Sequence, residues 1–246
     1  MNELERLNRI IPVRILRTGE DGKDSRGAVL ETLGMITGSG MITGAEMEPA
    51  WKIETEKRGK PYFADHGDTA FSVSDCAGLT AVCFDRTRVG IDLQEHRRGR
   101  RDTEERLLSR CLSIAARAFH ADENSYVKAA SASDPGEAVR RFFCIWSAKE
   151  AYVKYTGSGI DDYFSKFSVL PNACESVRCG GETGAFPGRE EKTGRGGLPL
   201  EETGSASFHA LGKWFFCAEL YSAEMNLRFS LCICAEKEKP VAYRFG

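Results

Sequence analysis

The stretch FFCIWSAKEAYVKYTGSG, residues 142–159, carries the clearest helical pattern of the chain. Its apolar and aromatic residues recur at helical intervals, and we predict a helix over Glu137–Tyr155. Gly157 and Gly159 follow it, and glycine commonly ends a helix in the left-handed conformation. This helix is the most strongly patterned element that the sequence predicts.

Glu150 lies on the aromatic side of this predicted helix. At 100° per residue, Phe143 falls about 20° and Trp146 about 40° from it around the helix axis. An ionised carboxylate among apolar side chains needs a cationic partner or a metal ion. Lys154, one turn later, could form an ordinary ion pair worth about 0.2–0.5 kcal/mol. A metal and phosphate site, with Glu150 on the cation and Lys154 on a phosphate oxygen, also explains the aromatic surroundings. The residues alone leave both readings open.

A second acidic residue, Asp92, lies near the end of a predicted strand, Arg88–Leu93. Side chains alternate between the faces of a strand, so Asp92 shares a face with Gly90 and Gln94. We expect Gly90 to leave room for a ligand to approach the backbone. A carboxylate there is an oxygen ligand that suits Mg²⁺. Taken alone, the pattern agrees more often with an aspartate that ends an edge strand and faces water.

The remaining pattern combines short strands with two further helices, which is typical of an α+β fold. The helices are predicted at Ala28–Met41 and Arg106–Phe119. Strands are predicted at Ile10–Leu16, Trp51–Glu54, Phe71–Ser74, Leu79–Phe84, Phe164–Val169, Lys213–Tyr221 and Leu227–Ala235. We expect a hairpin across residues 85–87, between the strands at 79–84 and 88–93. The order reads twice as strand, helix and antiparallel strands, which suggests two similar halves.

The composition is ordinary for a soluble globular protein of 246 residues, with 41% apolar residues and a net charge of −2. We therefore expect neither nucleic acid nor a membrane as a partner. Met1–Arg17 lacks the apolar segment of a secretory signal. The nine cysteines lie mostly in apolar stretches without a CxxC pair, so we expect reduced core thiols in a cytoplasmic protein. Asn172–Ser207 is rich in Gly, Glu, Arg and Thr, and we predict a flexible insertion there.

VGIDLQ at residues 89–94, followed by the stretch at 142–159, resembles the 4′-phosphopantetheinyl transferases. The resemblance is to the larger, two-halved (surfactin-synthetase-activating) type, which serves peptide and polyketide synthetases and lysine metabolism. That family has a GID element and, later, a W-S-x-K-E-x-x-x-K helix; here Asp92 and Glu150 are 58 positions apart. Residues 59–61 match the family's G-K-P turn, and residues 71–76 lie where the family has a strand ending in Ser-His-Ser.

The resemblance implies a pseudo-dimer of two similar α/β halves, each a helix packed on a small antiparallel sheet. The halves would span residues 1–105 and 106–246, with coenzyme A in the cleft between them. The implied reaction is Mg²⁺-dependent transfer of 4′-phosphopantetheine from coenzyme A to a serine of an acyl or peptidyl carrier protein. We expect a cytoplasmic monomer. The alternative is a non-catalytic relative that binds coenzyme A or carrier protein without transfer.

The resemblance also implies roles for individual residues. Asp92 and Glu150 would bind Mg²⁺, with Gln94 in the place of a second carboxylate of the GID element. Glu150, or a water that it holds, would take the proton of the carrier serine, and Lys154 would stabilise phosphate charge. The residues expected to bind coenzyme A are Arg26, Lys60, Pro61, Ser74, Asp75 and Lys154.

Two positions depart from the family pattern. Gln94 lacks the usual charge, so a water would complete the metal shell and affinity for the ion could fall. Asp75 replaces the histidine of Ser-His-Ser, and an aspartate there would repel a phosphate. Either the phosphates are held differently, or Asp75 turns away, or activity is reduced. The basic run His96–Arg101 could bind an acidic carrier helix or the 3′-phosphate of coenzyme A, or could be a solvated loop.

Overall fold

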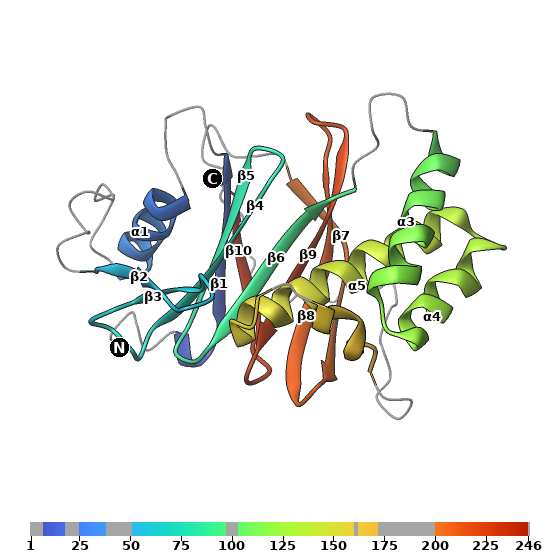
Figure 1. The fold of residues 1–246 in the computed structure, drawn as a ribbon. Coiled ribbons are helices and arrows are strands. Elements are labelled where there is room, and N and C mark those ends of the chain that lie inside the picture. Colours follow the sequence, from blue (N-terminus) through green and yellow to red (C-terminus); the bar gives the residue numbers. More distant parts are fainter. Residues whose placement is uncertain are drawn as a thin grey trace.

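The computed structural model describes residues 7–17, 25–37, 51–96, 103–159, 162–171 and 200–245. Two four-stranded sheets stand in the middle of the molecule, with α1 on one side and α3 and α4 on the other (Figure 1). This is an α+β fold made of two sheet-and-helix halves, as the sequence predicts.

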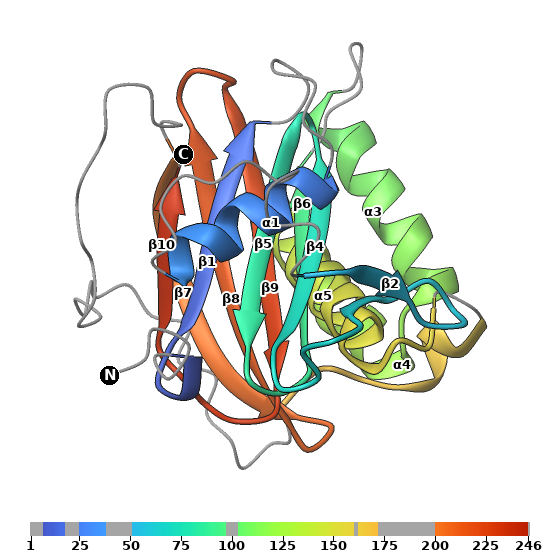
Figure 2. The same cartoon turned by 90° about the vertical axis from the view of Figure 1, so that its left-hand side faces the viewer.

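The first sheet has the strand order β10-β1-β5-β4. Its strands span β1, Ile11–Arg17; β4, Ala70–Cys76; β5, Leu79–Asp85; and β10, Val241–Phe245. Helix α1, Ser25–Ile36, lies across its outer face, as Figure 2 shows, and packs on aromatic residues that include Phe71 and Phe84. Strands β2, Ile53–Thr55, and β3, Pro61–Phe63, form a two-stranded antiparallel ribbon. The ribbon packs into the same apolar cluster as α1.

The second sheet has the strand order β6-β9-β8-β7 and is antiparallel throughout. Its strands span β6, Val89–Glu95; β7, Leu200–Ala210; β8, Lys213–Ser222; and β9, Leu227–Ala235. The long helix α5, Pro135–Thr156, packs on its outer face. Helices α3, Glu104–Ala118, and α4, Ala121–Ser131, pack in turn on α5.

The two sheets pack face to face through apolar side chains that alternate along their strands. In β8, Phe216 and Leu220 point to the first sheet, whereas Phe215 and Cys217 point to α5. Alternation of this kind is expected when both faces of a strand are covered. The core therefore has three parts: one between the sheets and one under each layer of helices.

The predicted hairpin across residues 85–87 is wrong, because β5 and β6 do not pair with each other. β5 pairs with β1 and β4 in the first sheet, whereas β6 pairs with β9 in the second. The turn between them therefore carries the chain from one sheet to the other. β6 from the first sequence half lies in the second sheet, and β10 from the last residues pairs with β1 in the first. The division at residue 105 stays a prediction.

Side chains of β4 satisfy the free edge of β6 at this junction. The backbone N–H groups of Ile91 and Leu93 donate to the hydroxyls of Ser72 and Ser74, each at 3.1 Å. Glu95 N–H donates in the same way to the Cys76 sulfur. β4 thus fixes the position of β6 without extending its sheet.

Several other elements differ from the predictions. Residues 164–169 form no strand, because a 3₁₀ helix, η2, spans Asp162–Lys166. Helix α4 and strand β10 were not predicted, and α1 ends at Ile36. Residues 200–207, assigned to the insertion by composition, form the first part of β7, while 172–199 lie outside the described residues.

Candidate active site

Gly90 determines how closely β6 approaches α5. A Cβ at this position would lie 2.0 Å from the Ala151 carbonyl oxygen and 2.5 Å from the Tyr155 nitrogen. The space beside this glycine is therefore filled by the backbone of α5, and the expectation that it leaves room for a ligand was wrong. The close contact brings Asp92, two residues later in β6, against the last turns of the helix.

Asp92 is buried, with 5% of its surface exposed, and it joins the two halves. Its Oδ1 accepts hydrogen bonds from Lys154 Nζ at 2.9 Å and from Ser74 Oγ at 3.1 Å. Lys154 Nζ also donates to Ser74 Oγ, at 2.8 Å. Within the described residues, Asp92 Oδ2 has no hydrogen-bond partner although it is buried. This rules out the reading of Asp92 as an aspartate that faces water.

Glu150 is also buried, with 8% of its surface exposed. Burial raises the pKa of its carboxyl from 4.5 to about 7; the negative charge of Asp92 adds to the rise and Lys154 opposes it. Lys154 makes its ion pair with Asp92 and not with Glu150. The ordinary pair along the helix is therefore replaced by a pair between α5 and β6.

The chemistry of this site fits a divalent cation. Asp92 and Glu150 are hard oxygen donors on neighbouring elements, and one buried oxygen of Asp92 has no partner in the described residues. The described residues contain no group of three or more His, Cys, Asp or Glu side chains able to hold a metal. Gln94 is partly buried and its amide donates to the Glu95 carbonyl at 3.3 Å. The protein itself therefore offers two carboxylates, and water would fill the other positions of an ion.

The residues expected to bind coenzyme A occupy different positions. Ser74 lies next to Asp92, where its hydroxyl donates a hydrogen bond to Asp92 and accepts one from Lys154. Asp75 points to the other face of β4, where it accepts hydrogen bonds from Ser25 of α1 and from Thr80. Of the three explanations offered for this aspartate, its turning away agrees with the structure. Arg26 is exposed in the first turn of α1. In the sequence it lies well before the other residues expected to bind coenzyme A.

Lys60 and Pro61 belong to the turn and strand that meet the end of α5. Pro61 opens β3 and pairs with Thr55. Lys60 is buried, and its ammonium donates to two backbone carbonyls, that of Val89 at 2.9 Å and that of Lys154. Burial lowers the pKa of Lys60 to about 8. Its ammonium is therefore directed into the junction of β6 and α5.

Lys149 and Glu123 form a buried ion pair that the sequence did not suggest. Neither side chain is exposed, and Lys149 Nζ lies 2.7 Å from Glu123 Oε2. Glu123 also accepts from the backbone N–H groups of His120 and Val169. The ammonium lies 4.1 Å from the centre of the Phe167 ring. The pair connects α4 and the segment after η2 to α5, next to Glu150. The one signal of this ion pair in the sequence is a charged residue, Lys149, among the apolar residues of the helix.

The basic run begins with a buried residue. His96 stacks on Phe143 with ring centres 4.3 Å apart, and its Nε2 lies 2.8 Å from Ser230 Oγ. Burial, assisted by Arg228 and Arg140, lowers the pKa of His96 to about 3, so the ring is neutral at physiological pH. Residues 97–101 lie outside the described part of the chain.

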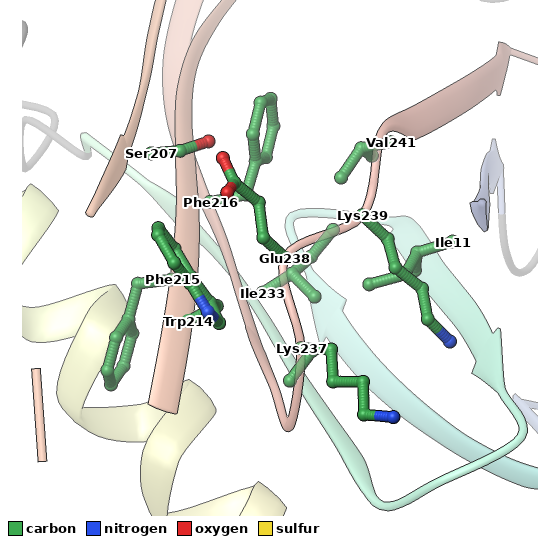
Figure 3. Close-up of a pocket in the computed structure, with 11 residues that line it drawn as sticks. Ile11, Ser207, Trp214, Phe215, Phe216, Ile233, Lys237, Glu238, Lys239 and Val241 are labelled. Atoms are coloured by element: carbon green, nitrogen blue, oxygen red, sulfur yellow. The ribbon is translucent and has the colours of Figure 1, made fainter. Parts of the chain in front are cut away.

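A small pocket opens elsewhere, between β1, β8 and the chain leading into β10 (Figure 3). Trp214, Lys237 and Lys239 are among its lining residues, and its volume is about 10 Å³. That is about the space of one water molecule. None of the candidate site residues lines it, so it does not compete with the Asp92 site.

Comparison with known protein families identifies the segment that contains this site. Residues 88–192 match the family model of the 4′-phosphopantetheinyl transferase superfamily. The matched segment carries Asp92, Glu150 and Lys154, whereas Lys60 and Ser74 precede it.

Individual transferases show the same partial similarity. The chain is 30% identical over 118 residues to the 4′-phosphopantetheinyl transferase Sfp of Bacillus subtilis (strain 168), covering 48% of this chain and 46% of that protein. It is 34% identical over 118 residues to psf-1 of Bacillus pumilus, covering 48% and 44%. It is 35% identical over 114 residues to HetI of Nostoc sp. (strain PCC 7120), covering 44% and 43%. The match thus spans slightly less than half the length of these transferases.

No described helix is long and apolar enough to span a membrane.

Proposed function

We propose that this chain transfers 4′-phosphopantetheine from coenzyme A to a serine of an acyl or peptidyl carrier protein, with Mg²⁺ as cofactor. The observation that carries the proposal is the meeting of Asp92 and Glu150 beside Lys154, where β6 packs on α5. The similarity of residues 88–192 to the transferase superfamily supports the same reaction.

In the proposed reaction, the serine oxygen of the carrier bonds to the β-phosphorus of coenzyme A. The bond from that phosphorus to the oxygen of 3′,5′-ADP breaks, and 3′,5′-ADP leaves with the electron pair. Glu150, or a water held by it, takes the serine proton.

In this proposal, Lys154 would stabilise negative charge on the pyrophosphate. Its ammonium is held by Asp92 and Ser74 at 2.9 and 2.8 Å, so it is already oriented before a substrate arrives. Asp92 and Glu150 would hold Mg²⁺ through their carboxylates. When bound, the ion would neutralise charge on the phosphate oxygens and orient them.

The test is mass spectrometry of apo carrier proteins after incubation with coenzyme A and Mg²⁺. We expect the carrier to gain the mass of one phosphopantetheine group, and Glu150→Gln to abolish the gain while circular dichroism shows an intact fold. Glu201→Gln, at an exposed glutamate of β7, is the matched control and should transfer at the wild-type rate.

The second candidate is a protein that binds coenzyme A or carrier protein without transfer. Gln94 and Asp75 favour it, because Gln94 replaces a carboxylate that the family uses for the metal and Asp75 replaces a histidine that meets phosphate. Binding of coenzyme A without mass gain on any fatty-acid, polyketide or peptide synthetase carrier would support this candidate. Full activity of Glu150→Gln would instead refute the assignment of the base and the metal ligand.

A further inference from the structure

The C-terminal end of α5 is bound by basic side chains from the N-terminal part of the chain. The last carbonyl groups of a helix have no partners within it. Here Lys60 donates to the Lys154 carbonyl, and Arg88 donates to those of Tyr155 and Thr156, at 3.3 and 2.8 Å. Arg58 donates to the Ser158 carbonyl just beyond the helix. We call Arg58, Lys60 and Arg88 the α5 clasp.

Lys60 is the buried member of the clasp, with 9% of its surface exposed. Its ammonium bridges two elements, because it donates to the Val89 carbonyl in β6 as well as to the Lys154 carbonyl in α5. Val89 lies three residues before Asp92 in the same strand. A cation at the C-terminal end of a helix also interacts favourably with the helix dipole. One side chain therefore ties together the backbones that carry Asp92 and Lys154.

The fit between the clasp and the helix end is close. Gly157, which ends α5 with φ 70°, would place a Cβ 2.8 Å from Glu56 Oε2 and 3.3 Å from Lys60 Cδ. Glu56 forms an ion pair with Arg88. A backbone hydrogen bond of 2.8 Å from Glu56 N to the Lys60 carbonyl closes the turn between them. The turn at 56–60 is thus shaped to receive the end of α5.

We propose that Lys60 is a positioning residue of the transfer site, which holds β6 and the end of α5 in register so that Asp92, Glu150 and Lys154 face one another. The proposal rests on the proposed function. It gives Lys60 a different role from the one that the family resemblance implies, because the two observed hydrogen bonds of the ammonium go to backbone carbonyls. Loss of a residue that binds coenzyme A directly should mainly raise KM for coenzyme A, whereas loss of a positioning residue should mainly lower kcat.

The experiment compares Lys60→Met, which keeps the length but removes the donors, with Lys60→Arg, which keeps a cation. Lys57→Met is the control, since Lys57 is an exposed lysine of the same turn. Rates of carrier modification are measured at a temperature where circular dichroism shows all variants folded. We expect kcat of Lys60→Met to fall about 10- to 100-fold, with KM for coenzyme A within about twofold of wild type. Lys60→Arg should recover most of kcat, and Lys57→Met should match wild type.

A Lys60→Met variant with unchanged kcat and a strongly raised KM for coenzyme A would overturn the proposal, because it would show direct binding of the substrate. Amide hydrogen exchange provides a readout that does not depend on activity. We expect Lys60→Met, but not Lys57→Met, to speed exchange in residues 89–95 and 150–157. If the wild type modifies no carrier, the proposed function fails on its own, and unchanged exchange in Lys60→Met would refute the clasp separately.

Discussion

Replacement of Glu150 by glutamine should change how the stability of the protein depends on pH. The folded protein raises the pKa of this carboxyl to about 7, against 4.5 in an unfolded chain. A raised pKa means that the carboxyl contributes its stability fully below pH 4.5 and loses it as pH rises through about 7. The rise corresponds to about 3 kcal/mol, because each pH unit between the two values is worth about 1.4 kcal/mol.

Urea denaturation at several values between pH 5 and pH 8, with EDTA present, measures this effect. In the metal-free protein, the free energy of unfolding of the wild type should fall across the window by about 2–3 kcal/mol more than that of Glu150→Gln. Added Mg²⁺ should reduce the difference, because a cation favours the charged carboxylate. Glu201→Gln, at an exposed site, should keep the wild-type slope. Parallel curves for wild type and Glu150→Gln would show that burial does not raise the pKa of Glu150.

Three further predictions concern the frame of the site. Gly90→Ala should lower the free energy of unfolding by about 3 kcal/mol or more in urea titrations, since its Cβ would lie 2.0 Å from the Ala151 carbonyl; wild-type stability would contradict the close packing. Lys149→Met should cost about 3–5 kcal/mol in the same assay, because it leaves the Glu123 carboxylate buried without its cation, and adding Glu123→Gln should recover part of that loss. Gln94→Glu should hold or raise the transfer rate at low Mg²⁺; a marked loss in a rate assay across Mg²⁺ concentrations would show that Gln94 has another role.

The sequence predicted the elements whose pattern is local. Helix α5 was found to within a few residues because its apolar stripe and its glycine stop are both written in consecutive residues. The hairpin between β5 and β6 was wrong for the opposite reason. A short turn joins two apolar strands there, but β5 pairs with β4 and β1 in the first sheet, whereas β9, the partner of β6, lies far along the chain. No local pattern distinguishes a hairpin from a crossing between two sheets.

The site residues show the same difference between local patterns, which the sequence predicts, and contacts between distant positions, which it does not. Asp92 and Glu150 were chosen from the sequence, yet the function of Gly90 was misjudged because the helix that fills its space is 61 residues away at Ala151. The strand predicted at 164–169 failed because side chains bind its backbone: Lys149 Nζ donates to the Phe167 carbonyl, and Glu123 accepts from Val169 N–H. Contacts of this kind join distant positions and leave no periodic signal.

Binding of Mn²⁺, followed by electron paramagnetic resonance as a substitute for Mg²⁺, tests most directly whether the two carboxylates share a cation. We expect one ion per chain in the wild type and in Glu201→Gln. Asp92→Asn and Glu150→Gln should each weaken binding about tenfold or more, since each removes a charged oxygen ligand. Wild-type affinity in either variant would contradict a cation held jointly by β6 and α5.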